Sequence, residues 1–338
     1  MLGIFKDNYF KIDNTNAITL IIPEGRKQDM NSKTRDKGYD INCLCYMLNE
    51  LSREIHNNPD ISDFKMTITN KDLAKIMGYD VINAKQHRLY GIKETKDLLF
   101  TRVKNVLVYD AITGNMASIP IFKYILWETD AQEIYIEFNP RFIEYVKDCK
   151  ELTDVEGYTR LYLDICVSLS TLNSKIIWAI LCRYNSQLDY AGHTDMKAIT
   201  LLNYISPYTI EGKKKIYTMR FNDLETTVNR AIKEINTLLV EKALLQNKTP
   251  IGYEVEWEWS ITNGATSKRG KLLSVSFTKT ELNPNDFIEE PKQDIVTTKT
   301  KYSGANKKTK KSTKDSKPKE SKKEQTTKKR HNYFGDMK

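Results

Sequence analysis

The sequence predicts an α+β protein, because segments with the 3.6-residue period of a helix alternate with segments that have the two-residue period of a strand. The clearest helix begins at 221, where apolar residues recur at steps of three and four. The clearest strand lies at 252–259, where aromatic and aliphatic residues alternate with glutamates. With 338 residues, 40% of them hydrophobic, the chain is long enough to bury two cores.

The helix that begins at 221 has two different faces. One face is apolar and is expected to pack on a core: Leu224, Val228, Ala231, Ile232, Ile235 and Leu238. The other face carries amide, hydroxyl and cationic groups, which can hydrogen-bond base edges or phosphates in a groove wide enough for a helix. Its members are Asn222, Thr226, Asn229, Arg230 and Lys233. A face that is only solvated would have the same composition. The segments that follow the helix are therefore needed to distinguish a DNA-binding face from a solvated one.

Two strands follow this helix and predict a hairpin. The strand at 252–259 is joined to an apolar run at 272–277 by a connection that contains Asn263-Gly264, a turn pair that tolerates positive φ. A helix followed by a hairpin with a basic tip predicts a winged helix-turn-helix, whose wing can touch the DNA backbone. We expect phosphate contacts from the basic residues of the tip and of the segment before the helix: Lys214, Lys215, Arg220, Lys268, Arg269 and Lys271.

The N-terminal half predicts a second winged helix-turn-helix. A scaffold helix is expected at 41–55, and Thr69 or Asn70 can cap a short helix that Gly78 ends. A basic helix is expected at 83–100, with five residues that face DNA: Lys85, Gln86, Arg88, Lys93 and Lys96. Strands at 106–109, 119–122 and 134–138 complete this domain. Two winged helices in tandem are therefore the predicted architecture.

The second of these domains resembles the plasmid replication initiators that bind iteron repeats. The resemblance lies in an aromatic and basic cluster at 213–221, a helix that ends Ala231-Ile232-Lys233-Glu234-Ile235-Asn236, and the hairpin after it. It extends to 174–184, which looks like the helix that opens the family's second domain, and more loosely to residues from about 38 onward. The segment 195–208 departs from the family pattern, because the sequence there looks irregular where the first helix of a helix-turn-helix is expected.

The resemblance implies how the protein works. Monomers would occupy iterons on double-stranded DNA with both winged helices on one face, destabilise an adjacent A·T-rich origin segment, and recruit host helicase and initiator proteins. A dimer, formed mainly through the N-terminal domain, would repress its own promoter. The alternatives are a tandem winged-helix transcriptional regulator without an origin-opening role, a replication nickase, and a charge-driven DNA coater.

Four parts of the chain follow from these patterns. Residues 1–37 form an N-terminal arm or strand, with one strand expected at 17–22. Residues 38–150 form winged-helix domain 1, for dimerisation and DNA contact, and residues 151–285 form winged-helix domain 2, for the main iteron binding. Residues 286–338 form a disordered Lys-rich tail.

Charge is concentrated in that tail. Residues 291–338 hold 16 of the 53 basic and 5 of the 44 acidic residues, which leaves residues 1–290 close to neutral. The tail either keeps the protein soluble or grips phosphates without sequence preference, in which case its contribution falls with salt.

Enzymatic and metal-binding functions find little support in the sequence. The glycines of 264–272 have the wrong spacing for a phosphate loop, and the four histidines are isolated, whereas a nickase needs a metal-holding pair. Five scattered cysteines predict buried thiols in a reducing compartment. We therefore expect no catalytic residue, no metal and no cofactor. We also expect no membrane association and a cytoplasmic location, because no apolar run is long enough to span a bilayer and the N-terminus lacks a signal-peptide layout.

Overall fold

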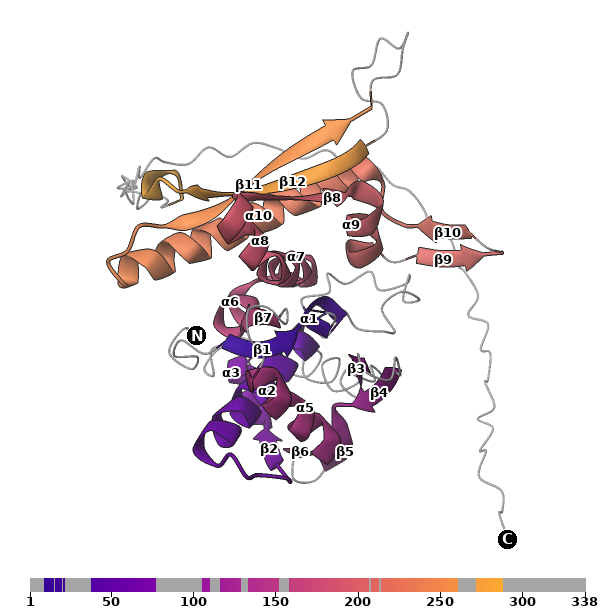
Figure 1. The fold of residues 1–338 in the computed structure, drawn as a ribbon, viewed down its shortest axis with the longest axis vertical. Coiled ribbons are helices and arrows are strands. Elements are labelled where there is room, and N and C mark those ends of the chain that lie inside the picture. The colour runs from indigo at the N-terminus through magenta and orange to yellow at the C-terminus, as the bar shows by residue number, and fades with distance from the viewer. Residues whose placement is uncertain are drawn as a thin grey trace, which may run out of the picture. The chain divides into compact units, whose positions relative to one another are not determined.

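The computed structural model describes residues 9–14, 16–19, 21, 38–76, 105–109, 116–128, 133–151, 158–206, 208–212, 214–260 and 272–287. In these segments, helices and small antiparallel sheets alternate as the sequence predicts (Figure 1). A continuous hydrophobic core joins the helices and sheets of both halves. None of the helices in the described segments is long and apolar enough to cross a membrane. The predicted Gly78 helix end, basic helix at 83–100, Asn263-Gly264 turn and C-terminal tail lie outside the described residues.

The N-terminal half is built on one long helix and a three-stranded sheet. Its elements are α2 (Tyr39–Asn57), β2 (Lys65–Thr69), α3 (Asn70–Ile76), β3 (Asn105–Tyr109), β4 (Met116–Pro120), β5 (Phe122–Glu128), β6 (Glu133–Phe138) and α5 (Pro140–Glu151). The sheet has the order β2-β6-β5, and β3 and β4 form a separate antiparallel pair. The scaffold helix predicted at 41–55 and the strand predicted at 134–138 are confirmed.

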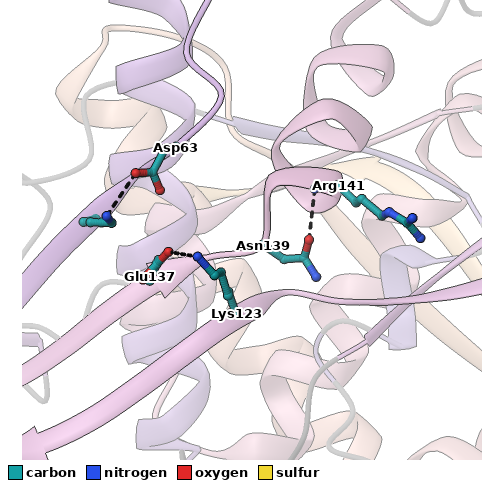
Figure 2. A network of polar contacts seen from close by, with 6 residues as sticks. Asp63, Lys123, Glu137, Asn139 and Arg141 are labelled. Carbon is teal, nitrogen blue, oxygen red and sulfur yellow. Dashed lines mark hydrogen bonds and ion pairs between the residues drawn. The ribbon is translucent and has the colours of Figure 1, made fainter.

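Local polar contacts fix the ends of these elements. The Thr69 hydroxyl accepts a hydrogen bond from the Asp72 amide at 3.2 Å, and the Asp72 carboxylate accepts one from the Thr69 amide at 3.3 Å, so Thr69 is the predicted cap of α3. Figure 2 shows Lys123 of β5 paired with Glu137 of β6 at 2.5 Å, and the Asn139 side chain accepting a hydrogen bond from the Arg141 amide at the start of α5.

The C-terminal half has the element order of a winged helix. Its elements are β7 (Tyr158–Tyr162), α6 (Leu163–Ser168), α7 (Leu172–Arg183), α8 (Asn185–Ala191), β8 (His193–Lys197), α9 (Ala198–Ile205), β9 (Tyr208–Glu211), β10 (Lys214–Tyr217), α10 (Phe221–Leu245), β11 (Ile251–Trp259), β12 (Leu272–Glu281) and the 3-10 helix η2 (Pro284–Asp286). β11, β12 and β8 form one antiparallel sheet in that order (Figure 1). The predicted wing strands are confirmed, and α10 continues past the predicted end at Asn236 to Leu245.

Three sequence expectations about local structure were wrong. The strand expected at 17–22 is replaced by the short helix α1 (Asn16–Thr19), because Asp13 accepts a hydrogen bond from the Asn16 amide at 3.1 Å and starts a helical turn. The strand in this region is instead β1 (Tyr9–Asp13), which pairs with β7. The strand expected at 119–122 is interrupted, since β4 ends at Pro120 and β5 begins at Phe122 around a buried Ile121.

The third expectation concerned the segment 195–208, which holds the regular helix α9 rather than an irregular chain. Ala198, Leu201, Leu202 and Ile205 are all buried and follow the helical spacing of three and four residues. Ser206 has an extended backbone and ends the helix one residue before Pro207, as the restriction on a residue before proline requires. The first helix of the C-terminal helix-turn-helix is therefore present.

Candidate nucleic-acid interface

Helix α10 presents the two faces that its sequence predicts. Leu224, Val228, Ala231, Ile232 and Ile235 are buried, and Leu238 is half-buried. All five polar residues of the opposite face are exposed: Asn222, Thr226, Asn229, Arg230 and Lys233. They lie at spacings of three, four and one, so they form one stripe along the N-terminal half of the helix. The structure thus gathers these five predicted residues on one surface.

Three side chains fix α10 on its own domain. Glu234 accepts hydrogen bonds from the Ser170 amide at 2.5 Å and the Ser174 hydroxyl at 2.6 Å, both at the start of α7. Asn236 is buried and exchanges two hydrogen bonds with the backbone of Tyr253 in β11, at 2.8 and 2.9 Å. Lys242 forms an ion pair at 2.6 Å with the buried Asp164 of α6. The direction in which the polar stripe points is therefore set by polar contacts as well as by apolar packing.

The members of the stripe differ in how many of their polar groups are available. The side-chain oxygen of Asn229 accepts a hydrogen bond from Trp257 Nε1 of β11 at 3.1 Å, and the Thr226 hydroxyl donates to the Asn222 carbonyl at 3.2 Å. Within the described part of the chain, the side chains of Asn222, Arg230 and Lys233 make no hydrogen bond or ion pair. These three side chains keep all their donors for an external partner, while Asn229 keeps its amide donors.

More basic residues precede the stripe. Lys214, Lys215 and Arg220 are exposed between the end of α9 and the start of α10. Lys215 Nζ also lies 4.6 Å from the ring centroid of Tyr208 and donates to Asn203 of α9 at 3.2 Å. The first turn of a helix carries a partial positive charge, so these residues and the helix start favour an anion at the same end of α10.

The sheet of the wing carries the opposite charge on one face. Glu254, Glu256 and Glu258 are exposed on β11, and the cross-strand register places Asp195 of β8 on the same face, opposite Ser276 of β12. Trp257, which alternates with these glutamates, donates to α10 and therefore belongs to the other face. These carboxylates are exposed, and their charge disfavours phosphate on this face.

Several predicted residues lie outside the described part of the structure. These are Lys268, Arg269 and Lys271 at the tip of the wing, and Lys85, Gln86, Arg88, Lys93 and Lys96 in the N-terminal domain. Their contacts with DNA stay predictions.

Sequence reasoning did not find the hairpin that β9 and β10 form between α9 and α10. The register pairs Tyr217 with Tyr208 and Lys215 with Ile210, and Gly212 at the turn has a φ of 61°. The available signal was weak, since it consisted of two four-residue strands around one glycine.

The sequence of the N-terminal half is similar to one known protein family. Residues 26–182 match the family model described as Initiator Replication protein, WH1, where WH1 denotes the first winged helix. The N-terminal half of the chain is therefore similar to initiator replication proteins. No curated protein sequence matches the chain.

A solved structure has a similar fold over most of the length of this chain. The Pi initiator protein, crystallised in complex with iteron DNA, aligns with a TM-score of 0.50 and 15% identity. The alignment covers 82% of this chain and 98% of that chain, so it includes elements of both halves. The predicted α+β fold with two winged helices in tandem is thereby confirmed.

Proposed function

We propose that this protein is a replication initiator, which binds repeated double-stranded DNA sites, the iterons, at a plasmid origin and starts replication there by binding. The observation that carries the proposal is the exposed stripe of α10, which a winged helix holds at a fixed angle and which keeps Arg230 and Lys233 available. A helix with this composition fits the major groove, where arginine reads guanine and asparagine reads adenine. The complex of the Pi initiator with iteron DNA supports the same choice of partner.

The proposal divides the work between base contacts and phosphate contacts. Asn222, Thr226, Asn229, Arg230 and Lys233 contact the groove. Lys214, Lys215, Arg220, Lys268, Arg269 and Lys271 contact phosphates, and the basic residues of the first winged helix add a second set. The protein performs no covalent chemistry of its own, acts in the cytoplasm, and as a dimer represses its own promoter. Opening of the A·T-rich segment and recruitment of host helicase complete the proposed role.

A binding titration of the full chain tests this division. We expect Arg230→Ala to weaken binding to the DNA beside its own gene by about 1–3 kcal/mol and to relax sequence preference, because one base contact is lost. Lys268→Ala should weaken native and scrambled duplexes about equally and lower the salt slope by about 1. Lys248→Ala, at an exposed lysine beyond the end of α10, serves as the control. Equal and small losses for Arg230→Ala and Lys268→Ala would contradict the proposal.

A further inference from the structure

The two helices of the C-terminal helix-turn-helix are joined by a hairpin where a turn of three or four residues is usual. Helix α9 ends at Ile205 and α10 begins at Phe221, and strands β9 and β10 fill the interval. Ser206 closes the base of the hairpin, since its hydroxyl accepts a hydrogen bond from the Met219 amide at 3.1 Å. The hairpin therefore projects from the junction at which the polar stripe of α10 begins.

Side-chain contacts attach the hairpin to α9. Asn203 of α9 accepts hydrogen bonds from the Tyr217 hydroxyl at 2.5 Å and from Lys215 Nζ at 3.2 Å. The rings of Tyr208 and Tyr217 meet edge to face with their centroids 5.8 Å apart. Both hydrogen bonds to α9 come from β10, and β9 is attached through the contact of Tyr208 with Tyr217, so the hairpin is held in place beside α9.

Each face of the hairpin exposes one isoleucine and one lysine. The register places Ile210 beside Lys215 on one face, and Lys214 and Ile216 on the other. Ile210 is 68% exposed and Ile216 is 44% exposed. One exposed isoleucine is ordinary on a protein surface, but here each face of a short hairpin beside α10 combines an isoleucine with a lysine, which suits a partner that has both apolar and anionic groups.

We infer that the β9–β10 hairpin is a second DNA-reading element, which rests on the proposed function of α10. The hairpin enters the major groove with its turn first, so that both of its faces meet the groove. Lys214 and Lys215 contact phosphates, and Ile210 and Ile216 contact the 5-methyl groups of thymines, the apolar feature that this groove displays. A two-stranded ribbon has the width that the major groove admits. Glu211, paired with Lys214 in the register, partly offsets the positive charge at the turn.

Removal of single methyl groups from the DNA tests the inference directly. Each thymine of the native duplex is replaced in turn by deoxyuridine, which lacks only the 5-methyl group, and affinity of the full chain is measured. We expect at least one substitution to weaken wild-type binding about fourfold, the value for one buried methyl-sized group. The double variant Ile210→Ser/Ile216→Ser should bind the substituted and unsubstituted duplexes equally. Ile251→Ser, at a 48% exposed isoleucine of β11, should respond as the wild type does.

The lysines have a separate readout. Lys214→Ala/Lys215→Ala should lower the slope of log affinity against log salt by about 2, because two phosphate contacts are lost. Glu211→Gln should raise affinity for every duplex, because it removes a negative charge near phosphates.

The outcomes separate the inference from the proposed function. A wild type that prefers the native duplex over a scrambled one but tolerates every deoxyuridine would overturn the inference and leave the proposed function standing. The same holds if wild type and the double isoleucine variant lose equal affinity at the same thymine, since the methyl contact then belongs to another element. Unchanged DNA affinity with a shifted oligomeric state in the double variant would assign the hairpin to a second copy of the chain and overturn the inference. A wild type without preference for the native duplex would overturn both.

Discussion

Replacement of Asn236 by alanine should destabilise the protein strongly, although Asn236 contacts no DNA in the proposed complex. The Asn236 side chain is buried in α10 and exchanges hydrogen bonds of 2.8 and 2.9 Å with the carbonyl and amide of Tyr253. β11 is at the edge of its sheet, so the Asn236 side chain hydrogen-bonds backbone groups of β11 that have no partner in a neighbouring strand. Gly252 permits the close approach, since a Cβ at that position would collide with the Asn236 side chain.

The size of the effect follows from the two backbone groups that lose their partner. A buried donor or acceptor left without a hydrogen bond costs about 1–3 kcal/mol, so Asn236→Ala, which leaves two such groups, should lower the free energy of unfolding by about 2–6 kcal/mol. Gly252→Ala should destabilise at the same place through the steric clash. Because the two residues touch, the effects of the two substitutions should not add.

Urea unfolding measures this loss and can be followed by tryptophan fluorescence, since two of the four tryptophans, Trp257 and Trp259, lie in β11. Asn222→Ala is the matched control, because Asn222 is an exposed asparagine of the same helix, and its replacement should change stability by less than about 0.5 kcal/mol. A loss for Asn236→Ala as small as that of the control would refute the reasoning, since it would mean that water serves the Tyr253 backbone equally well.

Three further predictions concern buried ionisable side chains. Lys242→Met should cost about 3 kcal/mol in urea unfolding by leaving the buried Asp164 carboxylate without its cation, and adding Asp164→Asn should recover most of the loss. Burial lowers the pKa of Lys175 in the folded protein, so between the folded and the higher unfolded pKa the unfolded chain binds more protons. The free energy of unfolding should therefore rise with pH in that window. Lys175→Met should flatten this rise, and an unchanged slope in the variant would contradict the prediction. All five cysteines are buried, so iodoacetamide at neutral pH should reach them only in unfolding concentrations of urea. For Cys149, burial also raises the thiol pKa to about 11, which disfavours the reactive thiolate. Rapid alkylation of the native protein would contradict this prediction.

The sequence predicts the parts of the fold in which one pattern continues over many residues. The two faces of α10 are readable because the apolar residues repeat over four turns, and β11 is readable because four apolar residues alternate with three glutamates. Short elements cannot be predicted in this way, because the pattern does not repeat often enough. The apolar run 17–22 favours a strand by composition, but residues 16–19 form a helical turn whose first amide, from Asn16, donates to the Asp13 carboxylate. Helix α9 is only eight residues long.

Part of the candidate site could likewise be predicted from the sequence, and part could not. The exposure of the polar stripe follows from the helical period, so Asn222, Arg230 and Lys233 could be placed on one surface without a structure. The bond that ties Asn229 to Trp257 spans 28 residues, and the pair of Lys242 with Asp164 spans 78. No local pattern reports contacts over such separations, so the sequence cannot distinguish an available side chain from one that already has a partner.

The positions of these long-range contacts along α10 bear on how the helix reads DNA. Glu234, Asn236 and Lys242 fix its C-terminal half to α7, β11 and α6, whereas the exposed stripe lies mainly in its N-terminal half. Recognition helices contact bases mainly through their N-terminal residues, and side chains on a rigid support lose less entropy on binding. The 25-residue length of α10 therefore serves attachment as much as contact. In the proposed complex, the C-terminal turns set the angle at which Arg230 and Lys233 meet the groove. Loosening those turns should reduce specificity without removing any group that touches DNA.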